Sequence, residues 1–116
     1  MICQFSVSFP VALASNPRTE LVGVWDDDSG RGQTFANQYG TSYFPDAKAL
    51  VGQCDAVAIA SENLNHLRDI RVAAEQGKAI LCEKPLAGRI DDLAAIQTAA
   101  AGVPFMTAFP CPFAPA

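Results

Sequence analysis

Runs of basic residues and long apolar stretches are both missing from this sequence. No cluster of lysine or arginine occurs, the formal net charge is −4 and the pI is near 4.7, which argues against a protein that binds nucleic acid or anionic membranes. No apolar stretch approaches the roughly 20 residues of a membrane-spanning helix. Residues 1–8 lack the basic start of a secretory signal. We therefore expect neither nucleic acid nor a membrane among the partners.

Cysteine and histidine are too few and too scattered to predict a metal site. Cys3, Cys54, Cys82 and Cys111 show no spacing typical of zinc ligands, and His66 is the single histidine. Two of these cysteines, at positions 54 and 82, lie in or beside apolar runs. We expect no bound metal, free thiols in place of disulfides, and a cytoplasmic location where thiols stay reduced.

What remains is an ordinary globular composition in a short chain. The 116 residues are 50% hydrophobic and 17% charged, which suits one domain with a single core. Short apolar runs alternate with segments whose apolar residues recur at helical spacing. Such alternation predicts an α/β fold with a parallel sheet and helices on both faces. We expect residues 1–116 to form a single domain.

The expected strands and helices can be assigned along most of the chain. Gly40 is expected to end one helix and Asp46 to cap the next. Residues 1–14 stay open, because they fit an alternating strand as well as one face of a helix. In the helix after residue 90, Leu93, Ile96 and Ala99 share one face. Strands are predicted at residues 21–25, 42–44, 55–60, 79–82 and 103–109, and helices at 30–39, 47–51, 65–77 and 91–102.

Polar side chains follow three of the predicted strands. The carboxyl ends of parallel strands meet at one edge of a sheet, where ligands of such folds bind. There a carboxylate can accept hydrogen bonds from both hydroxyls of a ribose, and a lysine can take the proton of a substrate hydroxyl while hydride leaves. The residues concerned are Asp26, then Ser61 and Asn63 with nearby His66, then Glu83 and Lys84.

Four of these residues also have a plain structural explanation. Asp26 could be an acid in a solvated turn before a helix, and Lys84 an ordinary surface lysine. Asn63 could cap a helix, and His66 could be an exposed partial cap in the first helical turn. Both interpretations stay open at this point.

Several segments form an ordered set along the chain: residues 21–26, 35–40, 55–61 with Asn63 and His66, 74–78, 81–86 and 101–106. Together they resemble the nucleotide-binding half of the glucose-fructose oxidoreductase and inositol dehydrogenase family (Gfo/Idh/MocA), over roughly residues 9–116. The resemblance implies a Rossmann-like, NAD(P)-binding domain of oxidoreductases that act on a sugar, a polyol or a related hydroxy compound.

The resemblance also implies a role for each candidate residue. Asp26 would meet the adenosine ribose. Because its carboxylate would repel a 2′-phosphate, NAD is favoured over NADP, although a nearby Arg31 could offset that repulsion. Along the nicotinamide side would lie Ser61, Asn63 and His66. Glu83 and Lys84 would be the catalytic groups, facing the nicotinamide and the substrate.

Two departures from the family matter. Family members open with a strand and Gly-x-Gly-x-x-Gly, and no such turn precedes the matching residues 9–13. Members also continue into a substrate domain that is absent here. We therefore expect a truncated domain that turns over no substrate alone.

The expected fold lacks the usual first strand, which is central to the sheet. The strands at 21–25 and 56–60 would then flank a gap of unpaired backbone groups, each costing about 1–3 kcal/mol if buried. Residues 2–8 could fill this gap as a replacement strand, a second copy could supply a segment, or the protein could be longer at its N-terminus. An incomplete sheet also gives a reason to expect a homo-oligomer.

Two other kinds of protein remain as alternatives. One is a non-catalytic binding or dimerisation module that keeps the fold without the cofactor. The other is a receiver domain of a signalling protein, which shares paired acids such as Asp26-Asp27 and a Lys84-Pro85 pair. A receiver needs a phosphate-accepting aspartate at a central strand end, where this chain has Ser61.

Overall fold

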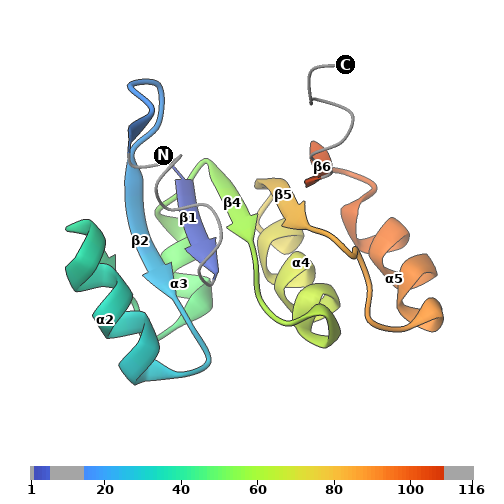
Figure 1. The fold of residues 1–116 in the computed structure, drawn as a ribbon. Helices are drawn as coiled ribbons and strands as arrows, with labels where there is room; N and C mark the ends of the chain where they lie inside the picture. Colours follow the sequence, from blue (N-terminus) through green and yellow to red (C-terminus); the bar gives the residue numbers. More distant parts are fainter. Residues whose placement is uncertain (1, 6–14, 109–116) are drawn as a thin grey trace, which may run out of the picture.

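The computed structural model describes residues 2–5 and 15–108, and shows six parallel strands in one sheet (Figure 1). The strand order β3-β2-β1-β4-β5-β6 is that of dinucleotide-binding folds. The predicted α/β parallel sheet is therefore confirmed. The strands are β1 (Ile2–Phe5), β2 (Leu21–Trp25), β3 (Ser42–Tyr43), β4 (Ala56–Ile59), β5 (Ala79–Glu83) and β6 (Phe105–Ala108). The helices are α2 (Ser29–Tyr39), α3 (Ala47–Gly52), the 3-10 helix η1 (Asn63–Asn65), α4 (His66–Glu75) and α5 (Ile90–Ala100).

The expectation of a missing central strand is wrong. β1 lies between β2 and β4 and pairs in parallel with both, with Phe5 opposite Trp25 on one side and Ile59 on the other. The possibility that a strand forms within residues 2–8 is therefore confirmed. With β1 in place, the gap that gave a reason to expect a homo-oligomer is filled. Residues 6–14, which contain no glycine, lie outside the described part of the chain.

Helix ends follow the predicted capping signals. The side chain of Asp28 accepts a hydrogen bond from the Arg31 backbone N–H and caps α2. The helix begins at Ser29, one residue before the predicted start. Gly40 ends this helix with φ of 62°, a left-handed conformation that favours glycine. Asp46 caps α3 by accepting from the next helical N–H groups, as predicted.

Helices lie on both faces of the sheet. The helix α2 connects β2 to β3 and lies on one face. The helices α3, α4 and α5 follow β3, β4 and β5, and because the crossovers are right-handed they lie on the other face (Figure 1). No described helix is long and apolar enough to cross a membrane. The main core fills the second face and includes Leu50, Val51, Val57, Ile59, Ile70, Ala73, Ile80, Cys82 and Ile96.

The predicted shared face of α5 is buried only in part. Ile96 is buried and Ala99 packs against the main core, whereas Leu93 is 46% exposed. The helix therefore contacts the core through Ile96 and Ala99.

Candidate functional site

The carboxyl ends of β2, β4 and β5 bring the predicted site residues to one edge of the sheet. Asp26 follows β2, Ser61 and Asn63 follow β4, and Glu83 is the last residue of β5 with Lys84 directly after it. The chain moves away from β1 in one direction through β2 and β3 and in the other through β4 to β6. Ligands of open α/β sheets bind outside the strand ends at such a switch point.

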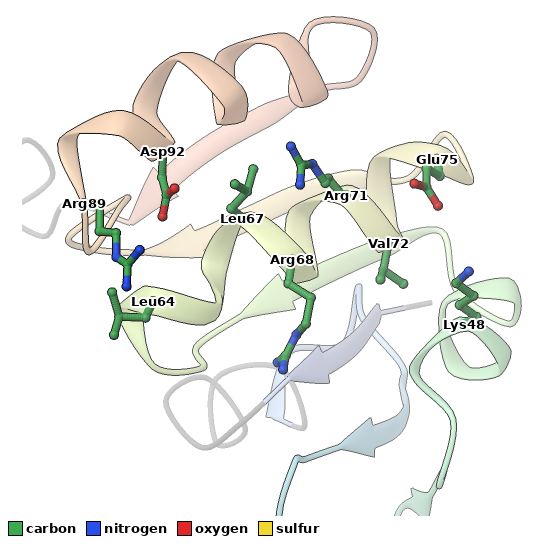
Figure 2. A pocket seen from close by; sticks show the side chains of 9 residues that line it. All are labelled: Lys48, Leu64, Leu67, Arg68, Arg71, Val72, Glu75, Arg89 and Asp92. Carbon is green, nitrogen blue, oxygen red and sulfur yellow. The ribbon is translucent and has the colours of Figure 1, made fainter.

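A separate hollow on the outer side of α4 has none of these residues in its lining. Its volume is about 520 Å³, and it lies over α4 between α3 and the start of α5 (Figure 2). Basic, acidic and apolar side chains alternate along it, so it is a mixed surface groove and not an apolar ligand pocket. The lining consists of Lys48, Leu64, Leu67, Arg68, Arg71, Val72, Glu75, Arg89 and Asp92.

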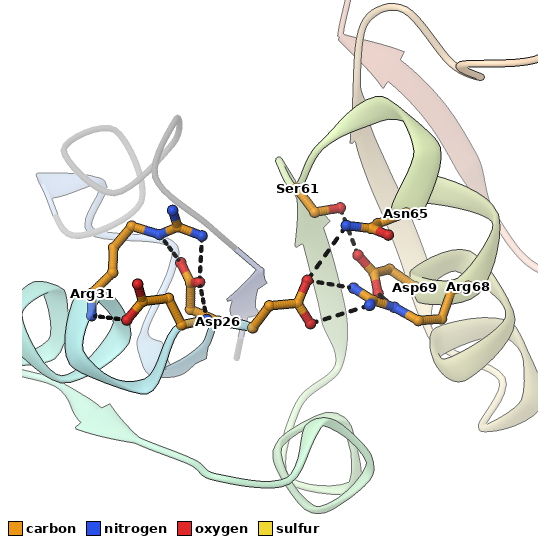
Figure 3. A network of polar contacts seen from close by, with 8 residues as sticks. Asp26, Arg31, Ser61, Asn65, Arg68 and Asp69 are labelled. Carbon is orange, nitrogen blue, oxygen red and sulfur yellow. Dashed lines mark hydrogen bonds and ion pairs between the residues drawn. The ribbon is translucent and has the colours of Figure 1, made fainter.

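At the end of β2, Asp26 is buried and paired with Arg31. The Arg31 Nε donates to Oδ2 at 2.8 Å and Nη2 to Oδ1 at 2.6 Å, while Oδ1 also accepts from the Asp28 N–H (Figure 3). Asp26 is only 6% exposed, so the alternative of an acid in a solvated turn is wrong. Its hydrogen bond and its charge raise the pKa of Arg31. Arg31 is therefore close enough to offset the charge of Asp26.

At the end of β4, Ser61 is held by a buried carboxylate that sequence reasoning missed. The Ser61 hydroxyl donates to Asp69 Oδ2 at 2.5 Å, and Arg68 Nε donates to Asp69 Oδ1 at 2.7 Å (Figure 3). Burial raises the pKa of Asp69, although the hydrogen bonds from Arg68 and Ser61 oppose this shift. The sequence signal was available, because Asp69 stands at helical spacing between the buried positions 66, 70 and 73 of α4.

Arg68 also joins α4 to the segment after β2. Its Nη1 and Nη2 donate to the two carboxylate oxygens of Asp27 at 3.1 and 3.2 Å, and its guanidinium carbon lies 5.2 Å from the ring centre of Trp25. Asn65 Nδ2 adds a longer contact of 3.4 Å to Asp27. Since β2 and β4 flank β1, this contact links the two sides of the central strand.

His66 is fully buried and connects two loops. Its Nε2 lies 3.0 Å from the carbonyl oxygen of Ser61, and its Nδ1 lies 3.1 Å from that of Leu86. The alternative of an exposed partial cap is therefore wrong, because both ring nitrogens are turned inward to backbone carbonyls. The arrangement fixes the loop after β4 against the turn after β5.

The remaining candidates lie nearer to solvent. Asn63 is exposed and is the first residue of η1, whose N-cap position belongs to Glu62, so Asn63 is not the cap that one alternative assigned to it. Glu83 is half-buried, and its Oε1 accepts from the Lys84 backbone N–H at 3.0 Å. The Lys84 side chain is exposed at the same edge, and its peptide bond to Pro85 is cis.

Comparison with known proteins agrees with this architecture. A family model described as an oxidoreductase family with an NAD-binding Rossmann fold matches residues 5–107. Inositol 2-dehydrogenase 3 from Saccharopolyspora erythraea is 36% identical over 75 residues, which are 63% of this chain and 22% of that protein. D-xylose 1-dehydrogenase (NADP(+)) 2 from Haloferax volcanii is 34% identical over 101 residues, covering 83% of this chain and 31% of that protein.

Solved structures show the same fold. The crystal structure of apo scyllo-inositol dehydrogenase from Lactobacillus casei superposes with a TM-score of 0.86 at 22% identity, over 97% of this chain and 37% of that one. Sheet order and sequence matches together define an NAD-binding Rossmann domain of the oxidoreductase class. The chain belongs to the Gfo/Idh/MocA family, and it spans 22% to 31% of the two curated relatives named above.

Proposed function

We propose that this chain binds NAD or NADP along the carboxyl edge of its sheet, as the cofactor-binding part of an oxidoreductase. The substrate would be a sugar, a polyol or a related hydroxy compound, as the names of the inositol and D-xylose dehydrogenases suggest. The observation that carries the proposal is the buried carboxylate of Asp26 at the end of β2 in a sheet of dinucleotide-binding order.

The donors and acceptors at the end of β2 fit the adenosine end of either cofactor. Asp26 Oδ1 accepts from the Asp28 N–H and from Arg31 Nη2, and Oδ2 accepts from Arg31 Nε. The remaining lone pair of Oδ2 would accept from a ribose hydroxyl, as acids at this position do in related folds. Arg31 is 53% exposed and neutralises Asp26, so a 2′-phosphate would meet a cation instead of an isolated carboxylate. The pair therefore weakens the preference for NAD that Asp26 alone would give.

On the nicotinamide side we assign contacts to Ser61, Asn63 and Glu83, and a positioning role to His66. His66 would act by holding the backbone of the two loops, since both its ring nitrogens already face carbonyl oxygens. The bound nicotinamide would supply hydride transfer. The exposed ammonium of Lys84 would polarise the substrate hydroxyl and take up its proton.

Hydride transfer would also need residues beyond these 116, because the matched relatives are several times longer. We therefore expect the purified chain to bind cofactor without oxidising inositols or sugars. A cytoplasmic location belongs to the same proposal and is supported by the free, buried thiol of Cys82.

A non-catalytic module of the same fold is the second candidate, favoured by the absence of glycine from residues 6–14. A receiver domain is not a candidate, because receivers have the strand order 2-1-3-4-5 and this sheet has the order β3-β2-β1-β4-β5-β6.

Calorimetric titration of the 116-residue chain with NADH and NADPH separates the two candidates. Saturable binding is expected, and an Asp26→Ala variant should weaken it while an Asp91→Ala variant on exposed α5 surface should not. If millimolar NADH and NADPH give no saturable heat with the folded chain, the non-catalytic module is the correct function.

A further inference from the structure

Arg68 holds two carboxylates that differ sharply in exposure. Its Nε donates at 2.7 Å to Asp69, whose side chain is 1% exposed, while its two terminal nitrogens donate at 3.1 and 3.2 Å to Asp27, whose side chain is 46% exposed. A buried, short contact is held firmly, whereas an exposed ion pair contributes little to stability. One side of the guanidinium is therefore anchored and the other is open to exchange.

The open side presents the geometry that a phosphate group requires. Nη1 and Nη2 each bond one oxygen of the same carboxylate, in the parallel two-pronged arrangement that arginine also makes with phosphate oxygens. The ring centre of Trp25 lies 5.2 Å from the guanidinium carbon of Arg68. The ring therefore limits how far the guanidinium can turn. Asp27 thus occupies a position suited to an anion.

The location matches the place where a dinucleotide needs such a donor. Arg68 reaches from the first turn of α4, after β4, to the segment after β2, and these strands flank β1. In folds of this order the diphosphate lies by the turn after the first strand, where glycines allow backbone N–H groups to approach it. Residues 6–14 contain no glycine, so this chain needs a cation from elsewhere.

We propose that Arg68 binds the diphosphate of the cofactor, exchanging Asp27 for phosphate oxygens while Asp69 keeps its hold on Nε. The inference rests on the proposed NAD(P)-binding function and adds a residue to it. Asp27 then acts as a competitor that occupies the guanidinium until the diphosphate replaces it. The two residues of one ion pair should consequently affect cofactor affinity in opposite directions.

The first test compares Arg68→Ala with Arg71→Ala, which removes the same charge from the same helix. Both residues line the groove of Figure 2, but the bidentate contact to Asp27 is made by Arg68. Titration with ADP-ribose and NADH should show affinity lowered roughly tenfold or more by the first variant and unchanged by the second. Adenosine, which carries no phosphate, should bind both variants as it binds the wild type.

The second test uses Asp27→Asn, which leaves the contact between Arg68 and Asp69 untouched and so avoids a buried, unpaired acid. Affinity for ADP-ribose should rise a few-fold, while Asp91→Asn on α5 should leave it unchanged. A pair with only a structural role would give weaker or unchanged binding in Asp27→Asn.

The outcomes separate this inference from the proposed function. If the folded wild type binds neither NADH, NADPH nor ADP-ribose, both are overturned. If the wild type binds and Asp27→Asn does not tighten binding, or a folded Arg68→Ala chain binds ADP-ribose normally, only the role of Arg68 is overturned. Circular dichroism of each variant identifies the folded samples.

Discussion

Two hydrogen bonds join Arg31 to Asp26, from Nε at 2.8 Å and from Nη2 at 2.6 Å. The acid is buried and the base is half exposed, so the pair presents a cation to solvent above a hidden carboxylate. A lone aspartate at this position would disfavour a 2′-phosphate, and under the proposed function the arginine would weaken that effect. We therefore expect the choice between NAD and NADP to depend on both residues together.

Replacing Arg31 by alanine should shift the cofactor preference toward NAD. The freed carboxylate of Asp26 would repel the 2′-phosphate of NADPH, and a charge-assisted contact would be lost. We expect NADPH affinity to fall about tenfold or more and NADH affinity to change little. Calorimetric titration with both cofactors measures this, with Arg18→Ala at an exposed turn as the control. Equal losses for NADH and NADPH would contradict the assignment.

Replacing His66 by leucine should destabilise the domain without creating a large cavity. The leucine keeps the apolar volume, but the carbonyls of Ser61 and Leu86 lose their partner in a buried site. We expect a loss of about 2–4 kcal/mol in the free energy of unfolding, from one or two unsatisfied groups. Urea unfolding measures it, and Asn65→Ala next to it in sequence serves as the control. A change below about 0.5 kcal/mol would show that the carbonyls find other partners.

The sheet and its edge could be predicted because β4 and β5 are apolar runs with polar residues directly after them. The central strand could not, because the pattern of residues 2–5 fits a strand or a helix, and only its pairing with both β2 and β4 decides. Periodicity places His66 and Asp69 on the inward face of α4, yet two of their partners, Ser61 and Leu86, lie in loops. Those contacts depend on tertiary structure.

The buried carboxyl of Asp69 should make stability fall as pH rises above the ordinary carboxyl pKa of 3.8. Burial raises the pKa of Asp69 in the folded state, so the folded chain binds more protons than the unfolded chain between the two pKa values. Stability from this group is full below the unfolded pKa and is lost as pH rises through the folded one. Asp69→Asn has no such proton to lose.

Unfolding free energies measured from pH 3 upward for the wild type and Asp69→Asn test this sign. The difference between the two should shift in favour of the asparagine variant as pH rises, then level off. Asp46→Asn, at an exposed cap of α3, serves as the matched control. A difference that shifts in favour of the wild type would mean that Arg68 and Ser61 outweigh burial.

The thiol of Cys82 should react with an alkylating reagent more slowly than a solvent-accessible thiol does. Burial raises its pKa to about 12, with smaller contributions from the charges of Asp69 and Glu83. Since the thiolate is the reactive form, iodoacetamide at pH 8 should leave Cys82 unmodified in the folded chain and modify it in denaturant. Peptide mapping by mass spectrometry reads the site directly. Rapid modification of Cys82 in the native chain would show that β5 opens readily.

Two glycines of α2 should respond in opposite ways to alanine. A Cβ at Gly32 would lie 2.6 Å from the Tyr43 ring and 3.1 Å from Asp26 Cβ, so Gly32→Ala would push α2 away from the end of β2. We expect a loss of about 1–3 kcal/mol in unfolding free energy, together with weaker cofactor binding because Asp26 moves. Gly30→Ala meets only Asp28 Oδ1 at 3.3 Å and should gain up to about 1 kcal/mol from helix propensity. Thermal and urea unfolding of both variants measure the two changes in unfolding free energy. Equal changes would mean that the close approach of α2 to β3 does not position Asp26.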